Sequence, residues 1–378
     1  MTLTLLLGIL PSMSFTFGVF VLNTIIPRAF AQATPASPDV SGNCQAPVWS
    51  PAGTQLAWEV NYHEKKTIEL YVAPFNGVAS PPRKLMPLNR GASAVTAGFD
   101  RAAPELVVHE ASFAPDSIKR LVYSSSGATQ DYDLYVDGAG VIAAGPGTDG
   151  GPAWSPDGKF IVFTSARTGQ GDLYLLDLAL MEKPPLRLTG DLNASEVYAA
   201  WSPDSKKVVY VGHGAQGDNL YLIDNLNFPA PRALTAWAHT QTRPAWSPDG
   251  TLVAFYSNHT DNRRFDLYTM PIGGTPTLIT TDVVMSHRGP IWSSDSKHVI
   301  YVKNDSDHFS PVWAAPVADP TRAAELKTGT VGNGDLALTR RADGSMWLAV
   351  AAQGRAGDPQ RDFKRIYVLP LPTLPATK

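Results

Sequence analysis

Residues 152–158 read Pro-Ala-Trp-Ser-Pro-Asp-Gly, and this phrase decides the fold because the chain repeats it. Closely similar phrases begin at residues 47, 199, 244 and 290, a degenerate copy spans 111–117, and a more eroded one spans 338–344. The aromatic residues at the shared position are Trp49, Phe113, Trp154, Trp201, Trp246 and Trp292. A position that collects so many of the chain's tryptophans indicates an internal repeat.

Each phrase is followed by two short runs of β-forming residues. The first run ends on an aromatic residue nine positions after the tryptophan, as at Phe163, and the second contains an aromatic such as Tyr174. Ser-Pro-Asp-Gly suits a tight turn, because Pro fixes φ, Asp bonds to nearby backbone and Gly accepts a positive φ. The unit therefore reads strand–turn–strand–loop–strand–turn–strand over about 45 residues, as in a β-propeller blade.

The repeats predict an all-β propeller of four-stranded antiparallel blades. First strands are expected near residues 48, 108, 153, 199, 245, 291 and 337, which favours seven blades. Six blades is the alternative, because the unit near residue 337 is weak and Trp49 is 64 residues from Phe113. The tail after Tyr367 is rich in proline, so the last blade is expected to have three strands or to be closed by residues 40–44.

The N-terminal residues predict export. No charged side chain precedes Arg28, and the apolar stretch leads into Ala29-Phe30-Ala31-Gln32, a small-x-small cleavage pattern. We predict a signal peptide over residues 1–31 and a periplasmic or extracellular protein, with an uncleaved membrane anchor as the alternative. Residues 32–44 then predict a Pro/Ser-rich tether, residues 45–370 the propeller, and residues 371–378 a C-terminal tail.

The composition excludes some classes of partner and binding site. The net charge is −3 and no run rich in Lys or Arg occurs, so no nucleic-acid partner is expected. Cys44 is the single cysteine, which excludes an internal disulfide and a cysteine-based metal site. We expect a monomer without a cofactor, in contact with a membrane only if the N-terminal segment stays attached.

The repeats resemble those of TolB-like β-propellers, the Trp-Ser-Pro-Asp-Gly class related to WD-repeat blades. The resemblance covers about residues 45–370 and implies an extracytoplasmic propeller that binds proteins. True TolB carries an α/β domain before its propeller, which we do not expect here, because only residues 32–44 separate the predicted cleavage site from the first blade. Similar blades also occur beside serine peptidase domains, but no Gly-x-Ser-x-Gly motif is present.

Residues that lead into the first strands are the candidate site, because first strands surround the axis of a propeller. The set combines imidazoles, carboxylates and two arginines, and it comprises His109, Glu110, Asp149, Glu196, His239, Gln241, Arg243, His287, Arg288 and Asp335. Arginines bind carboxylates or phosphates through paired hydrogen bonds. A solvated, charge-balanced rim is the alternative interpretation. No metal is expected, because no closely spaced ligand pair such as His-x-His occurs.

The remaining histidines extend this interpretation. His63, His213, His259 and His308 fall in loops expected on the same face as the candidate site, whereas His298 falls inside a strand. We therefore expect a non-catalytic binding module for a protein or glycan of the cell envelope. The alternative is a lyase or hydrolase that acts on an anionic substrate, with His109, His239 or His287 as base and Arg243 and Arg288 as clamps.

Overall fold

A computed structural model describes most of the chain after the predicted signal peptide. The described residues are 33–65, 67–77, 80–85, 108–115, 120–126, 131–190, 195–214, 217–261, 263–305, 309–357 and 362–377, with residues 108–110 and 214 described by their backbone. The predicted signal peptide, residues 1–31, and His308 lie outside this part. None of the helical segments described is long and apolar enough to cross a membrane.

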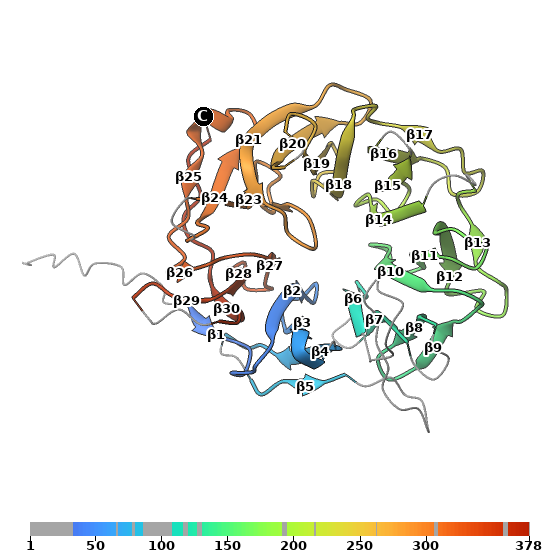
Figure 1. Ribbon diagram of the computed structural model, residues 1–378, viewed down its shortest axis with the longest axis horizontal. Helices are drawn as coiled ribbons and strands as arrows, with labels where there is room; N and C mark the ends of the chain where they lie inside the picture. The colour runs from blue at the N-terminus through green and yellow to red at the C-terminus, as the bar shows by residue number, and fades with distance from the viewer. Residues whose placement is uncertain are drawn as a thin grey trace, which may run out of the picture. The chain divides into compact units, whose positions relative to one another are not determined.

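Antiparallel sheets surround a common axis, and the strand that ends on the repeat tryptophan is the innermost of its sheet (Figure 1). We call each set of four such strands a blade and name it by its innermost strand. The β2 blade contains β2 (Asn43–Trp49), β3 (Gln55–Tyr62), β4 (Thr67–Pro74) and β5 (Arg83–Lys84). The β6 blade contains β6 (Val108–Phe113), β7 (Leu121–Ser125), β8 (Asp133–Val136) and β9 (Gly140–Ala143). The β10 blade contains β10 (Asp149–Trp154), β11 (Phe160–Ser165), β12 (Asp172–Asp177) and β13 (Leu186–Arg187).

The next strands pair continuously. The β14 blade contains β14 (Ser195–Trp201), β15 (Val208–Gly214), β16 (Gly217–Ile223) and β17 (Arg232–Ala233). It continues into β18 (His239–Trp246), β19 (Leu252–Ser257), β20 (Phe265–Pro271) and β21 (Thr277–Val284), and then into β22 (Ile291–Trp292), β23 (His298–Lys303), β24 (Val312–Pro316) and β25 (Ala324–Glu325). Because pairing joins β14 to β25 in one sheet, it does not count the blades, and the preference for seven over six stays a prediction.

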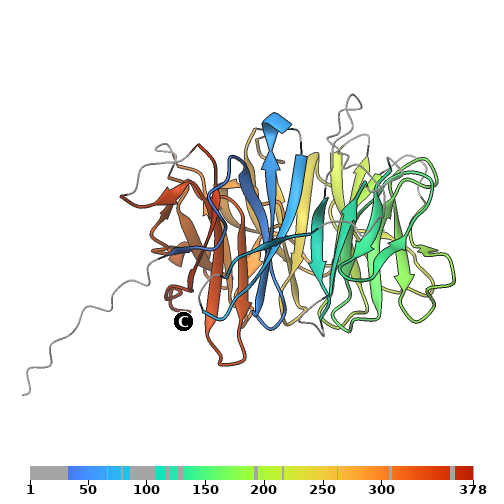
Figure 2. The ribbon, with the colours of Figure 1, turned by 90° about the horizontal axis from the view of Figure 1, so that it is seen from below.

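The last sheet brings the two ends of the described chain together. It consists of β27 (Leu336–Arg340), β28 (Met346–Ala352), β30 (Arg365–Pro370) and β1 (Thr34–Pro35), while β26 (Thr330–Val331) pairs with β29 (Gly354–Arg355). Two 3-10 turns, η1 (His63–Lys65) and η2 (Pro320–Arg322), complete the elements described. In the side view the strands run between two faces (Figure 2). The predicted all-β propeller of four-stranded antiparallel blades is confirmed.

Part of the segment expected to be a tether belongs to the propeller. The closing strand is Thr34–Pro35, which pairs with Tyr367 and Val368 of β30, rather than residues 40–44. A two-residue edge strand tolerates proline because its outer side needs no donor. Ala33 and Cys44 are fully buried, so small apolar side chains hold this segment against the sheets.

The repeat tryptophans join neighbouring blades. The indole Nε1 of Trp201 donates to the carbonyl of Ala153 at 3.0 Å, and Trp292 does the same to Ala245 at 3.0 Å. Trp49 donates to Ala337 at 3.2 Å, which links the β2 blade to the β27 blade. Each of these indoles is buried. The interpretation of the tryptophans as packing residues therefore agrees with their positions.

Candidate functional site

A β-bulge interrupts most of the innermost strands just before the tryptophan. The pairing register shifts between Val197 and Ala200 in β14, and between Thr242 and Ala245 in β18. The residue three positions before the tryptophan has a positive φ, and this holds for Ala46 (47°), Gly151 (59°), Tyr198 (54°), Arg243 (54°) and Gly289 (91°). Bulges redirect side chains away from the regular alternation of a strand. Equivalent positions in adjacent blades are thereby placed beside one another.

Tyr198 and Arg243 occupy that position in adjacent blades, and their side chains stack. The Arg243 guanidinium lies 3.7 Å from the centre of the Tyr198 ring. Among the described residues no carboxylate forms an ion pair with Arg243, and its buried Nε has no hydrogen-bond partner. At the next equivalent position a Cβ on Gly289 would lie 2.7 Å from the Arg243 carbonyl oxygen, so glycine is required there. The guanidinium is held by an aromatic face rather than by an anion.

Asp335, directly before β27, accepts four hydrogen bonds. Its Oδ2 accepts from the backbone N–H of Ala46 at 2.8 Å, and its Oδ1 accepts from the backbone N–H of His287 at 2.7 Å and from the Ser286 hydroxyl at 3.1 Å. The Nδ1 of His287 lies 2.9 Å from Oδ2. Burial alone would raise the pKa of Asp335, but His287 and these backbone donors hold it well below its ordinary value.

His287 is held by this carboxylate and still reaches solvent. Its side chain is 53% exposed, and its Nε2 makes no hydrogen bond within the part of the chain described. The hydrogen bond to Asp335 raises the pKa of His287, and burial and the charge of Arg243 only partly oppose this. Asp335 therefore stabilises a positively charged imidazole close to Arg243.

Arg288 reaches across to the β2 blade. Its Nε donates to the carbonyl oxygen of Ala46 at 3.0 Å, so Asp335 and Arg288 bind the two sides of one residue with a positive φ. Lys364 is near enough that the charge of Asp335 opposes the lowering of its pKa by burial. We define the inner-rim cluster as Tyr198, Arg243, His287, Arg288 and Asp335.

Three of the residues proposed from sequence are buried and hydrogen-bonded apart from the inner-rim cluster. Asp149 is fully buried and accepts two hydrogen bonds from Arg167, at 2.9 and 3.1 Å. Burial raises the pKa of Asp149, although the Ser165 hydroxyl and Arg167 oppose this. Glu196 is buried and accepts from the Thr189 hydroxyl at 3.2 Å.

Gln241 is also fully buried, and its amide donates to the Ala238 carbonyl oxygen at 3.2 Å. All three residues lie five positions before a tryptophan, ahead of the bulge that contains the Arg243 position. Their polar groups thus form hydrogen bonds within the fold.

The other candidates lie apart from the cluster. His239 begins β18, is exposed and has a φ of 67°, and no described contact joins it to Asp335. His109 and Glu110 lie in β6, and their side chains are outside the described part of the chain. The structure thus brings together Arg243, His287, Arg288 and Asp335. Sequence reasoning missed Tyr198, although it occupies the same repeat position as Arg243.

Two histidines of the outer loops, His213 and His259, have local partners. The Nδ1 of His213 lies 2.7 Å from Asp218, and the ring of His259 stacks on Trp237 at a centroid distance of 4.1 Å. His298 lies inside β23, as predicted, and its Nε2 donates to the Pro375 carbonyl oxygen at 2.8 Å. Within the described residues, no group of three or more His, Cys, Asp or Glu side chains is arranged to hold a metal ion.

Comparison with known proteins identifies the architecture. No protein-family model matches the sequence, and no curated protein matches it. Oligogalacturonate lyase from Vibrio parahaemolyticus is similar in structure, with 13% identity, a TM-score of 0.61, and coverage of 91% of this chain and 94% of that one. An oligogalacturonate lyase in complex with manganese gives 12% identity, a TM-score of 0.58, and coverage of 90% and 93%.

TolB structures are also among the matches. TolB from Acinetobacter baumannii gives 18% identity and a TM-score of 0.49, with coverage of 89% of this chain and 65% of that one. This chain therefore spans slightly less than two thirds of that protein. The likeness to the lyases confirms the β-propeller fold, and at such identities function has to come from the residues of this chain.

Proposed function

We propose that this protein is an exported β-propeller that binds an acidic group of an envelope protein or glycan at the inner-rim cluster, without catalysis. The observation that carries the proposal is the state of Arg243, a guanidinium stacked on Tyr198 without an ion pair to any described residue. Export rests on the predicted signal peptide, and a periplasmic or extracellular location follows from it.

Charge favours an anionic ligand at this place. Asp335 is 5% exposed and its oxygens already accept hydrogen bonds from the fold. Glu59, whose charge contributes to raising the pKa of His287, is buried and accepts from Gln45. The cationic groups are at least partly exposed, so an incoming carboxylate meets Arg243 and a protonated His287 rather than the buried carboxylates. A guanidinium held in one plane binds a carboxylate through two parallel hydrogen bonds.

Calorimetric titration tests the proposal with two acidic probes, a hexaglutamate peptide and a trigalacturonate. We expect binding at pH 6 that weakens at pH 8, because His287 loses its proton, and that weakens with added salt. Arg243→Ala should reduce affinity about tenfold, the loss of one charge-assisted contact. The matched control is Arg264→Ala, which removes an exposed arginine that pairs with Asp282.

Two results would overturn the binding site. The first is that neither probe binds the wild-type protein. The second is that Arg243→Ala and Arg264→Ala bind the probes equally well. The urea midpoint of each variant is measured alongside, so that a loss of binding is separated from a loss of folding.

A lyase or hydrolase at the same rim is the second candidate, and the His287–Asp335 pair favours it. A carboxylate that holds Nδ1 while Nε2 remains open is an arrangement suited to a general base. In a lyase, this base would remove the proton next to the substrate carboxylate while the glycosidic oxygen leaves. Activity would then rise with pH through the raised pKa of His287, the reverse of the trend expected for binding.

Product analysis separates the two candidates. Incubation with trigalacturonate should give no new ultraviolet absorbance and no new reducing ends if the protein only binds. An absorbance increase that His287→Gln abolishes would establish a lyase, and new reducing ends without absorbance would establish a hydrolase. His287→Gln is expected to retain part of the binding, because Arg243 is unchanged.

A further inference from the structure

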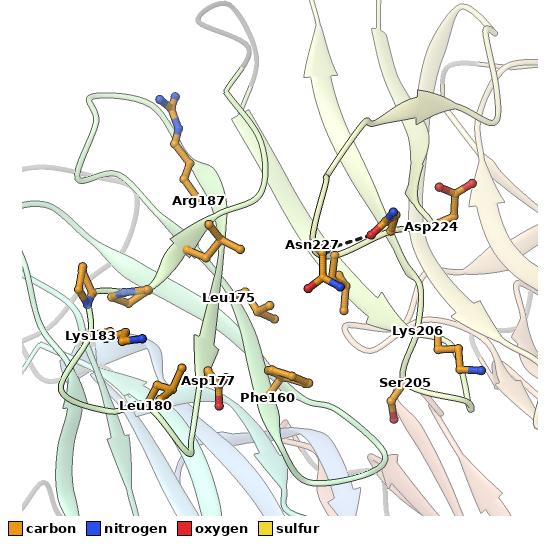
Figure 3. A pocket seen from close by; sticks show the side chains of 15 residues that line it. Phe160, Leu175, Asp177, Leu180, Lys183, Arg187, Ser205, Lys206, Asp224 and Asn227 are labelled. Carbon is orange, nitrogen blue, oxygen red and sulfur yellow. Dashed lines mark hydrogen bonds between the residues drawn. The ribbon is translucent and has the colours of Figure 1, made fainter.

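A cleft of about 780 Å³ lies at the outer edge of the propeller, between the β10 and β14 blades. One wall is the segment from Asp177 to Arg187, and the other is formed by residues 205–206 and 224–227. Phe160 and Leu175 lie between the walls (Figure 3). No member of the inner-rim cluster lines this cleft, so it is a separate surface.

Exposed apolar side chains gather around this cleft. Leu180 and Leu186 line it and are 38% and 49% exposed. Met181, at 43%, and Phe228, at 80%, adjoin lining residues in the chain. These are four of the eight large hydrophobic residues found exposed in the described part of the protein. Such a concentration on one surface marks a place where a partner covers apolar area.

Two lysines line the cleft without an ion pair to any described residue. Lys183 and Lys206 stand on opposite walls, and neither ammonium group forms an ion pair or hydrogen bond within the described residues (Figure 3). The other lining charges have local partners. Arg187 pairs with Asp172 at 2.8 Å, and Asp224 lies 3.6 Å from Arg232.

Asp177 is likewise engaged, because its Oδ1 accepts the backbone N–H of Ala179 at 2.9 Å. Glu182 is exposed nearby but does not line the cleft. A ligand with negative charges therefore complements Lys183 and Lys206.

The walls also present an open strand edge. β13 is the outermost strand of its blade and pairs only with β12, through Leu186 and Arg187. An extended chain can lie along such an edge, with alternate side chains directed toward the apolar floor. The preceding Pro184 and Pro185 lack N–H groups and end the edge sharply.

We propose that this outer cleft docks an extended segment of a partner protein that alternates large apolar and acidic residues. The apolar side chains cover Leu186, Phe160 and Leu175, and the acidic ones meet Lys183 and Lys206. This surface acts independently of the inner-rim cluster. The protein would thus hold a protein partner at its edge while its rim remains open.

An immobilised array of synthetic dodecapeptides, in which apolar content and net charge vary independently, tests the proposal with the full-length protein. We expect binding to increase with Leu and Phe content and with negative charge, and to fall with salt. Lys183→Glu together with Lys206→Glu should weaken the best peptides about tenfold or more. Leu186→Ser should weaken them similarly without shifting the urea midpoint, because its side chain is exposed.

The array is read with Arg243→Ala as the parent protein, so that acidic peptides bound at the inner-rim cluster do not contribute, and Arg264→Ala in that background should leave the pattern unchanged. Binding that ignores peptide charge, or that survives the double lysine substitution, would overturn the docking proposal. Sedimentation of the protein with anionic vesicles, abolished by the double substitution and without array binding, would assign the surface to a membrane instead. A dimer in sedimentation velocity that Leu186→Ser dissociates would assign it to a second copy of this chain.

Discussion

Asp149 and Asp335 are both buried carboxylates beside the start of an innermost strand, but their cationic partners differ. Asp149 is held by Arg167, whose charge does not change in the physiological range. Asp335 is held by His287, whose charge does. Burial raises the pKa of Asp149, whereas His287 and backbone donors lower that of Asp335. The same residue type thus serves a fixed scaffold in the β10 blade and a pH-responsive rim beside the β27 blade.

The strongest test of the scaffold side is Arg167→Met, which retains an apolar stem but removes the charge from Asp149. We expect a loss of about 3–5 kcal/mol in the free energy of unfolding, the usual result of stranding one member of a buried pair. The loss should shrink as pH falls, because protonation of Asp149 relieves the uncompensated charge. Urea unfolding at several pH values measures it.

Arg264→Met is the matched control for this substitution. Arg264 and its partner Asp282 are 63% and 33% exposed, so their pair should contribute less than about 1 kcal/mol. Similar losses for the two variants would remove the distinction between a buried and a solvated pair.

The rim side of the comparison is tested by His287→Gln. The pKa of His287 is raised above 6.5 in the folded protein, so its stabilising contribution is complete below about 6.5 and is lost as pH rises through the raised pKa. The pKa of Asp335 is below 3.8, so the carboxylate stays charged through this range. The stability gap between wild type and His287→Gln should therefore be largest near pH 5 to 6 and shrink toward pH 9.

Unfolding midpoints in urea across this pH series provide the measurement. The gap between wild type and Arg167→Met should change in the opposite direction and shrink as pH falls, because protonation of Asp149 relieves its uncompensated charge. A gap for His287→Gln that grows with pH would contradict the assigned protonation of the pair.

Two repeat tryptophans allow a test with a smaller expected effect on stability. Trp201 and Trp154 are similarly buried, but Trp201 donates to Ala153 whereas the indole Nε1 of Trp154 has no partner among the described residues. Trp201→Phe should therefore cost about 1 kcal/mol more than Trp154→Phe in urea unfolding, the net value of one hydrogen bond. Equal costs would show that packing alone joins these blades.

The degenerate repeat explains why these two tryptophans differ. The blade before Trp154 carries Phe113 at the tryptophan position and Ser112 where the other repeats have alanine, valine or isoleucine. The Ser112 hydroxyl accepts the backbone N–H of Trp154 at 3.3 Å. The departure from the repeat at residues 112–113, which is visible in the sequence, thus accompanies a different hydrogen bond between these two blades.

The fold was predictable from sequence because each blade repeats one local signal. The turn, the tryptophan and the paired strands lie within a short stretch, so each copy confirms the others. The closing strand at Thr34–Pro35 was not predictable, because two residues that include a proline carry no strand pattern.

The candidate site was predictable only in part, because it depends on bulges and on pairs that the sequence does not show. Gln241 and Arg243 are two residues apart, and in a regular strand their side chains would share one face. The bulge after Thr242 directs Gln241 into the blade and Arg243 toward Tyr198. The His287–Asp335 contact joins residues 48 positions apart, and no local pattern indicates it.

The smallest expected change in stability, and the finest test of the rim, is Tyr198→Leu. Loss of the ring under the Arg243 guanidinium should cost only about 0.5–1 kcal/mol of unfolding free energy, the usual value of an exposed cation–π contact. Binding of the acidic probes should nevertheless weaken several-fold, because Arg243 forms no other described contact that fixes its plane. Tyr198→Phe retains the ring and should bind like the wild type. If Tyr198→Leu and Tyr198→Phe bind the probes equally in calorimetry, the stacked arginine does not orient the ligand, and the rim then acts through net charge alone.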